Sequence, residues 1–295
     1  MYLEAKQYIV FYYPFKFNCM KKILAAVDFS EPSVNAARYA FDLVKQTPGA
    51  SLTLYYVYER ITAGSDGTPL LVDTEARRTV AMTALQNLIS ELGTALGVTI
   101  NAVAEEGSLA TSLEKYVQHL GIDLVVMGIT GSTRLEQIII GSNTLNVIAK
   151  EGFPVLIVPM GAAYKKINTV AFSTDLKDVA ASTPLQTLKA FLDFFNAGLY
   201  VVHVETEYNV IPPAAQKEKE KLEDMLKAFD PRYFFILEED FANAMEKFTE
   251  EYHPDIFITV PRRHSFLSRL FKERFTKKLA YNSPVPILAI HAKGE

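Results

Sequence analysis

Residues 128–143 read GITGSTRLEQIIIGSN and directly follow the apolar run Leu124–Met127. Glycines at 128, 131 and 141 carry no side chain, so a ligand can lie close to the backbone there. Gly141 and Ser142 open a helical pattern, and the amino terminus of a helix presents unpaired N–H groups that suit phosphate. Ser142 either caps this helix or bonds a phosphate oxygen. A strand, a glycine-rich loop and a helix in this order predict an α/β unit with a ligand site at the carboxyl end of the strand.

Spaced glycines alone are equally compatible with ordinary turns and a helix cap, and the spacing leaves both interpretations open. The strand before the loop and the helix after it favour a ligand site. The sequence contains no G-x-x-x-x-G-K-[ST], and no G-x-G-x-x-G follows a strand. The common P-loop and the dinucleotide fingerprint are therefore excluded.

The chain repeats this pattern once. LTLYYV at 52–57 matches LYVVHV at 199–204, and Asp28 falls on Asp175 at the same offset of 147 residues. FPVLIV at 153–158 matches VPILAI at 285–290, at an offset of 132 residues. Such self-similarity indicates one fold used twice. We predict an amino-terminal extension, a first domain and a second domain over residues 1–19, 20–160 and 161–295.

Both copies alternate short apolar runs with amphipathic helical patterns, which predicts parallel strands, right-handed crossovers and helices on both faces. The strands are expected near 23–27, 52–57, 98–104, 124–127, 155–158, 167–172, 199–204, 233–237, 256–260 and 286–290. The expected inner helix faces are Val34, Ala37, Phe41 and Val44; Leu85, Leu88, Ile89, Leu92 and Leu96; Leu109, Leu113, Val117 and Leu120; and Leu222, Met225, Leu226 and Phe229.

The spacing G-x2-G-x9-G-[ST] after the fourth strand is similar to the ATP-binding signature of the universal stress protein family. KKILAAVDFSEPS at 21–33 resembles that family's opening strand, and PVLIVP at 154–159 resembles its closing strand. The resemblance covers residues 20–295 as two repeats. It implies two open, twisted, five-stranded parallel sheets of order 3-2-1-4-5, like those of adenine nucleotide alpha hydrolases. The site is then expected at the switch point between strands one and four.

The resemblance also implies a ligand, ATP, whose phosphates carry Mg²⁺. The residues on the adenine and ribose side would be Ala26, Val27, Asp28, Val57, Met127 and Gly128. The residues that wrap the phosphates would be Gly131, Ser132, Gly141, Ser142 and Asn143. Family members pair through their last strands, which implies pairing of the two domains within the chain and leaves a homodimer open.

Asp28 has two interpretations. Its carboxylate can accept hydrogen bonds from a ribose or an adenine, or it can cap the helix that begins near Ser30. Asp175 repeats it in the second copy, where the glycine loop is missing, so a structural role is at least part of the answer.

The second copy has lost the loop. At the offset of 132 residues, the positions of Gly128, Gly131, Gly141 and Ser142 hold Val260, Arg263, Glu273 and Arg274. A glutamate at the start of a phosphate-facing helix repels an anion, so we expect no ATP binding of the family kind there. The basic segment 262–278 is either a solvated amphipathic stretch or a patch for an anionic partner, a membrane surface or the facing domain.

Composition limits the other classes of function. The 295 residues carry a net charge of −4, without the basic excess of nucleic-acid-binding proteins. The single cysteine, Cys19, excludes a disulfide framework and favours a reducing, cytoplasmic setting. No apolar run reaches membrane-span length. Residues 1–19 either result from a start codon assigned upstream of the true start at Met20 or form an extra amino-terminal strand or arm. No histidine has the spacing of a metal site.

We therefore expect a regulatory, stress-related ATP-binding protein with nucleotide in the first domain only. No catalytic residue can be assigned, so any hydrolysis is expected to be slow. An adenylating enzyme is one alternative, although its substrate pocket would need a polar cluster of its own. An adaptor that binds no nucleotide is the other.

Overall fold

The computed structural model describes residues 20–58, 74–129, 147, 153–205, 213–239, 241–261 and 285–291. The extension 1–19, most of the glycine loop and its helix, and the basic segment 262–278 lie outside these ranges. Predictions that fall on them therefore stay predictions.

The first half of the chain contains five strands. Its elements are β1 Lys22–Ala26, α1 Glu31–Lys45, β2 Ser51–Tyr58, α2 Thr74–Leu92, β3 Thr99–Glu106, α3 Leu109–Leu120, β4 Leu124–Ile129 and β5 Val155–Pro159.

The second half repeats this order with one helix broken in two. Its elements are β6 Thr169–Ser173, α5 Val179–Ser182, α6 Leu185–Phe195, β7 Gly198–Glu205, α7 Pro213–Leu226, the 3₁₀ turn Lys227–Phe229, β8 Arg232–Leu237, α8 Phe241–Tyr252, β9 Ile256–Thr259 and β10 Ile287–Ala289. All ten predicted strands are confirmed to within two residues at each end.

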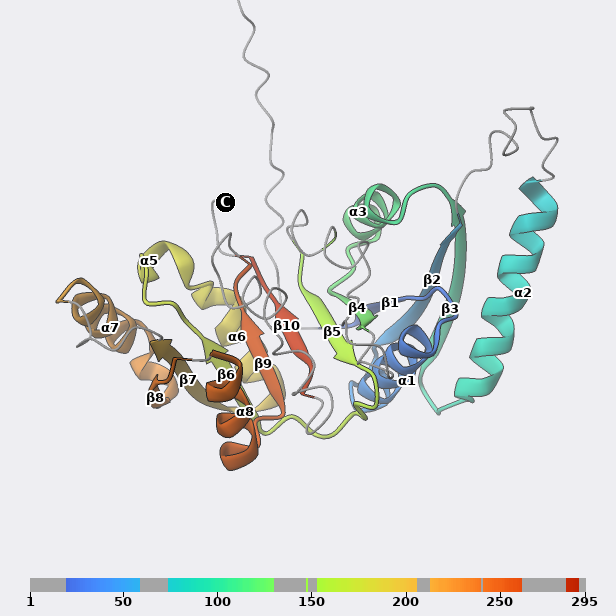
Figure 1. Cartoon of the computed structure of the whole chain (residues 1–295). Helices are drawn as coiled ribbons and strands as arrows, with labels where there is room; N and C mark the ends of the chain where they lie inside the picture. Colours follow the sequence, from blue (N-terminus) through green and yellow to red (C-terminus); the bar gives the residue numbers. More distant parts are fainter. Residues whose placement is uncertain are drawn as a thin grey trace, which may run out of the picture.

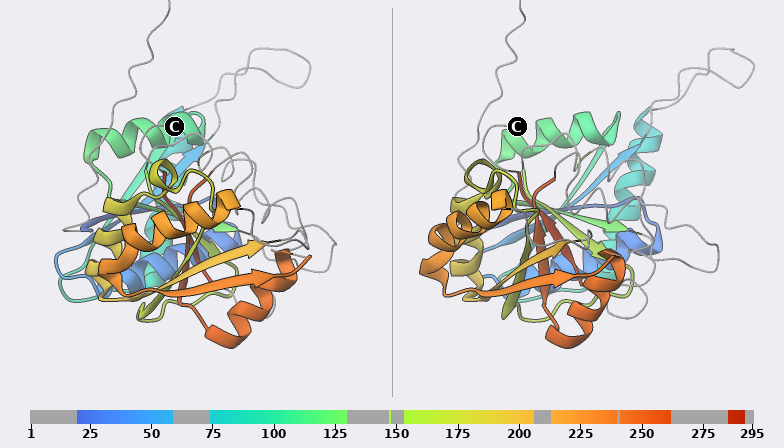
Figure 2. Two further views of the ribbon diagram at one scale, coloured as in Figure 1. Left: turned by 90° about the vertical axis from the view of Figure 1, so that its left-hand side faces the viewer. Right: turned by 60° about the vertical axis from the view of Figure 1, so that its left-hand side comes forward.

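The ten strands form one sheet of order β3-β2-β1-β4-β5-β10-β9-β6-β7-β8. The predicted α/β class and the order 3-2-1-4-5 are confirmed in each half. The halves are joined where β5 and β10 pair antiparallel, with Leu156 opposite Leu288, and these strands lie side by side at the centre of the sheet (Figures 1 and 2). Every other strand pair is parallel.

Helices cover both faces of the sheet. One core packs under α1, α2, α6 and α7, and the other packs under α3 and α8. Figure 1 shows α3 across the first-half strands from α1 and α2. Strands buried on both faces read as continuous apolar runs, which explains why the sequence located them so closely.

Two predicted helix faces are wrong at their ends. Leu96 is fully exposed, because α2 ends at Leu92 and the chain turns through Gly93 and Gly97, both at positive φ. Leu120 is 38% exposed because it is the last residue of α3.

One carboxylate clamp occurs in both halves. Asp123 Oδ2 accepts hydrogen bonds from the amides of Lys21 and Lys22 at 2.9 and 2.8 Å. In the second half, Asp255 Oδ2 accepts from the amides of Asn168 and Thr169 at 2.8 and 2.9 Å. Each clamp ties the start of the first strand to the start of the fourth.

Candidate functional site

The strand order reverses at β1, because β2 pairs on one side of it and β4 on the other. Ala26 at the end of β1 lies opposite Met127 on β4. Helices on opposite faces leave a crevice at such a switch point, where open α/β sheets bind their ligands. The structure therefore places the ends of β1 and β4 where the sequence predicted the site.

Three of the predicted residues share the α3 side of the sheet. Ala26 and Met127 are buried at 7% and 4% exposure, and Val57 is half-buried against the same core. Val27 packs into the core on the α1 side, and its amide donates to Tyr55 O at 2.9 Å. The candidate site would thus have an apolar wall on the α3 side.

Asp28 directly follows Val27 in the chain and is exposed. Its Oδ1 accepts hydrogen bonds from the Ser30 amide at 3.0 Å and the Ser30 hydroxyl at 2.5 Å. Partial burial acts to raise the pKa of Asp28, but the bonds from Ser30, with help from Ser33, outweigh it and lower the pKa below its ordinary value. Asp28 is therefore a carboxylate at neutral pH, with one oxygen already engaged.

Of the two interpretations of Asp28, the helix cap is wrong, because Ser30 is the N-cap residue of α1. Asp28 instead closes a short turn with the amide two residues later, a common role of aspartate. Asp175 closes the same turn with the Lys177 amide at 3.1 Å. The residues inside both turns, Phe29 and Leu176, have left-handed φ values of 65° and 52°, so this strand exit belongs to the repeated fold.

Close packing against α1 requires a glycine at position 128. A Cβ placed there would lie 2.2 Å from Pro32 O and 2.8 Å from Ser33 N. The side on which the missing side chain was expected to admit a ligand is therefore filled by the first turn of α1. Val260 holds this position in the second half, where the corresponding helix is split into α5 and α6.

The phosphate-side residues, Gly131, Ser132, Gly141, Ser142 and Asn143, lie outside the described residues. The structure adds two residues that the sequence reasoning missed, Ser30 and Ser33, which bond Asp28. The aspartate–x–serine spacing in DFS at 28–30 is typical of such a turn and was the available signal.

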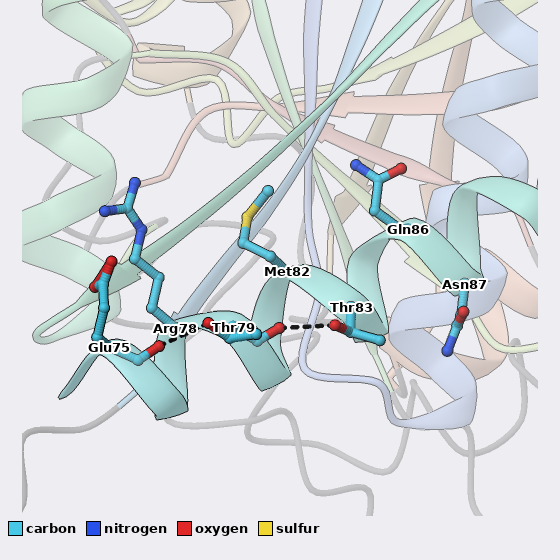
Figure 3. Close-up of a pocket in the computed structure, with 7 residues that line it drawn as sticks. All are labelled: Glu75, Arg78, Thr79, Met82, Thr83, Gln86 and Asn87. Carbon is cyan, nitrogen blue, oxygen red and sulfur yellow. Dashed lines mark hydrogen bonds between the residues drawn. The ribbon is translucent and has the colours of Figure 1, made fainter. Parts of the chain in front are cut away.

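A hollow of about 360 Å³ lies elsewhere, along α2. Figure 3 shows its lining residues, Glu75, Arg78, Thr79, Met82, Thr83, Gln86 and Asn87. The hydroxyls of Thr79 and Thr83 donate to helix carbonyls one turn earlier, at 2.9 and 2.8 Å. The hollow contains none of the predicted site residues.

Within the described ranges, no three His, Cys, Asp or Glu side chains are grouped to hold a metal ion. No helix in the same part of the chain is long and apolar enough to cross a membrane.

The open sheet, wound in both directions from β1, defines a doubly wound α/β protein. A family model described as the universal stress protein family matches residues 20–159. Universal stress protein MJ0531 of Methanocaldococcus jannaschii is 31% identical over 143 residues, which cover 48% of this chain and 83% of that protein. Universal stress protein MJ0577 of the same organism is 29% identical over 155 residues, covering 47% and 94%.

A solved universal stress protein from Archaeoglobus fulgidus matches with a TM-score of 0.62 at 15% identity, covering 94% of this chain and 98% of that one. This likeness shows that the fold extends over both halves. The chain belongs to the universal stress protein family.

Proposed function

We propose that this chain binds ATP at the carboxyl ends of β1 and β4 and acts as a regulatory, nucleotide-dependent protein. The observation that carries the proposal is Asp28, an exposed, ionised carboxylate fixed by Ser30 next to the apolar wall of Ala26, Val57 and Met127. An apolar wall suits an aromatic base, and a carboxylate accepts hydrogen bonds from sugar hydroxyls.

The phosphates would then extend toward Gly131 and Ser132 and the helix that opens at Gly141–Ser142. Backbone N–H groups of such a loop and helix start hold phosphate oxygens. Mg²⁺ would be bound by the phosphates and would neutralise part of their charge. Asp28 would stay on the ribose side, away from the triphosphate.

We also propose that the chain consists of two tandem domains, residues 20–160 and 161–295, of which only the first binds nucleotide. The repeated Asp123 and Asp255 clamps and the mirrored strand order support two copies. Val260 at the Gly128 position and Lys177 at the Ser30 position support the loss of the second site. Antiparallel contact of β5 with β10 would leave the two domains paired within one chain.

The repeat supplies a matched control for the test. Asp28→Ala should weaken ATP binding by about tenfold or more, because a charge-assisted hydrogen bond contributes about 1.5–3 kcal/mol. Asp175→Ala removes the same turn from the second half and should leave ATP affinity unchanged. Isothermal titration calorimetry on the full chain measures both. Equal losses in the two variants, or no loss in either, would rule out this site.

A further inference from the structure

Ser30 does not use its side chain as a helix cap. It is the N-cap residue of α1, with φ −66° and ψ 153°, yet its side chain makes no cap hydrogen bond. A serine in this position ordinarily accepts a hydrogen bond from a free helix N–H, which stabilises the helix. Here the hydroxyl is donated to Asp28 Oδ1 at 2.5 Å. The Ser30 side chain therefore does not cap α1 and instead donates a hydrogen bond to the Asp28 carboxylate.

Ser33, in the first turn of α1, forms hydrogen bonds to the same turn. It is buried at 6% exposure. Its hydroxyl donates to Ser30 O at 2.9 Å and accepts from the Asp28 amide at 3.2 Å. Asp28 is thus held through its main chain by Ser33 and through its side chain by Ser30.

This arrangement leaves the two carboxylate oxygens in different states. Oδ1 accepts both bonds that Ser30 donates, and Ser33 contributes further to lowering the pKa of the same carboxylate. A carboxylate has about four lone-pair sites, so Oδ2 remains able to accept donors from a ligand, in an orientation that Ser30 sets.

The second half shows that the fold does not require the Ser30 hydroxyl. There the Lys177 amide donates to Asp175 Oδ1 at 3.1 Å, and Lys177 has no hydroxyl to donate a second bond of the Ser30 kind. The bond from the helix to the turn is also present, because the Ser182 hydroxyl donates to Lys177 O at 3.1 Å, as Ser33 donates to Ser30 O in the first half. The turn forms in both halves, but the Ser30 hydroxyl that bonds the carboxylate has no counterpart at the matching position, Lys177.

From this difference we infer that Ser30 and Ser33 are positioning residues, which aim Asp28 Oδ2 at the ribose hydroxyls of the nucleotide and so make the site selective for ribonucleotides. The inference rests on the proposed function. The ligand feature recognised is a pair of vicinal hydroxyls, which donate to the carboxylate. A ribose that lacks one hydroxyl offers Oδ2 one donor fewer.

The test compares wild type, Ser30→Ala and Ser30→Thr by calorimetry with ATP and 2′-deoxy-ATP from pH 4 to 8. We expect Ser30→Ala to bind ATP about tenfold more weakly and to lose most of the preference for ATP over 2′-deoxy-ATP. Its binding should also fail at a higher pH than that of wild type, because loss of the Ser30 bond raises the pKa of Asp28 and the carboxylate is protonated earlier. Ser30→Thr keeps the hydroxyl and should restore all three properties, and Ser182→Ala should change none of them.

A second measurement does not depend on nucleotide. The carboxyl carbon of Asp28, followed by NMR in the ligand-free chain, should titrate at higher pH in Ser30→Ala than in wild type. Unchanged selectivity and an unchanged Asp28 titration in Ser30→Ala would overturn the inference while leaving ATP binding in place. A wild-type chain that binds no ATP would instead refute the proposed function, and the inference with it.

Discussion

Gly128→Ala tests the close contact between β4 and α1. The added Cβ would lie 2.2 Å from Pro32 O and 2.5 Å from Pro32 C. Both are main-chain atoms, so no side chain can rotate away, and the first turn of α1 must move by about 1 Å to reach an ordinary contact distance. Overpacking of this kind costs about 3 kcal/mol at the upper end of its usual range. Because Ser33 lies in the displaced turn, its bond to the Asp28 amide should also be disrupted and ATP affinity should fall.

Urea unfolding followed by circular dichroism measures the change in free energy of unfolding. Gly198→Ala is the matched control, because a Cβ there would meet only Asn168 O at an ordinary 3.8 Å. We expect a change within about 0.5 kcal/mol for the control, as at most uncrowded sites. If Gly128→Ala were as stable as Gly198→Ala, the contact between Gly128 and α1 would be refuted.

Three further predictions concern stability. Asp123→Ala and Asp255→Ala should each destabilise the chain by about 1–2 kcal/mol in urea unfolding, because each removes an acceptor shared by two amides; unchanged midpoints would show that the clamps contribute nothing. Arg232→Ala should cost about 1 kcal/mol, because the guanidinium lies over three aromatic rings at 5.2–5.9 Å, and thermal unfolding with Arg232→Lys as the conservative comparison checks this. Burial, and then the bond to Glu105, raise the pKa of Tyr55, so its phenol holds its proton in the folded state and stability should fall as the pH rises above about 10, the unfolded value. Tyr55→Phe should flatten that alkaline decline, and an unaltered profile would contradict the assignment.

The strands could be located from sequence because of where they lie in the fold. Strands such as β1, β4 and β5 are covered on both faces, so nearly every residue is apolar and the run stands out. The pairing order followed from the repeat and from the family resemblance. The antiparallel junction of β5 with β10 was expected only from the family resemblance, because local sequence carries no signal for it.

Helix ends were harder to predict, because periodicity shows a face and not a boundary. Leu96 continues the apolar spacing of α2 but follows its end, where Gly93 and Gly97 turn the chain. The split between α5 and α6 at Pro184 was not predicted either.

The site shows a different limit of sequence reasoning. The sequence identified Gly128 as a position that needs no side chain, but it does not say which neighbour occupies the space, and the neighbour is α1. Likewise, Ser30 looked like an ordinary residue at a helix start. Only the structure shows that its hydroxyl bonds Asp28 and not the helix.

Binding of nucleotide to the first half through the glycine loop is tested by measuring the nucleotide content and the ATP titration of the purified full chain. The comparison is with Gly141→Glu, which places in the first half the residue that the second half has at the matching position, Glu273. We predict that wild type co-purifies with ATP or binds it stoichiometrically, at one site per chain, and that the variant does neither. Wild type that neither contains nor binds ATP, or a Gly141→Glu variant that binds it as well as wild type, would refute nucleotide binding through the glycine loop.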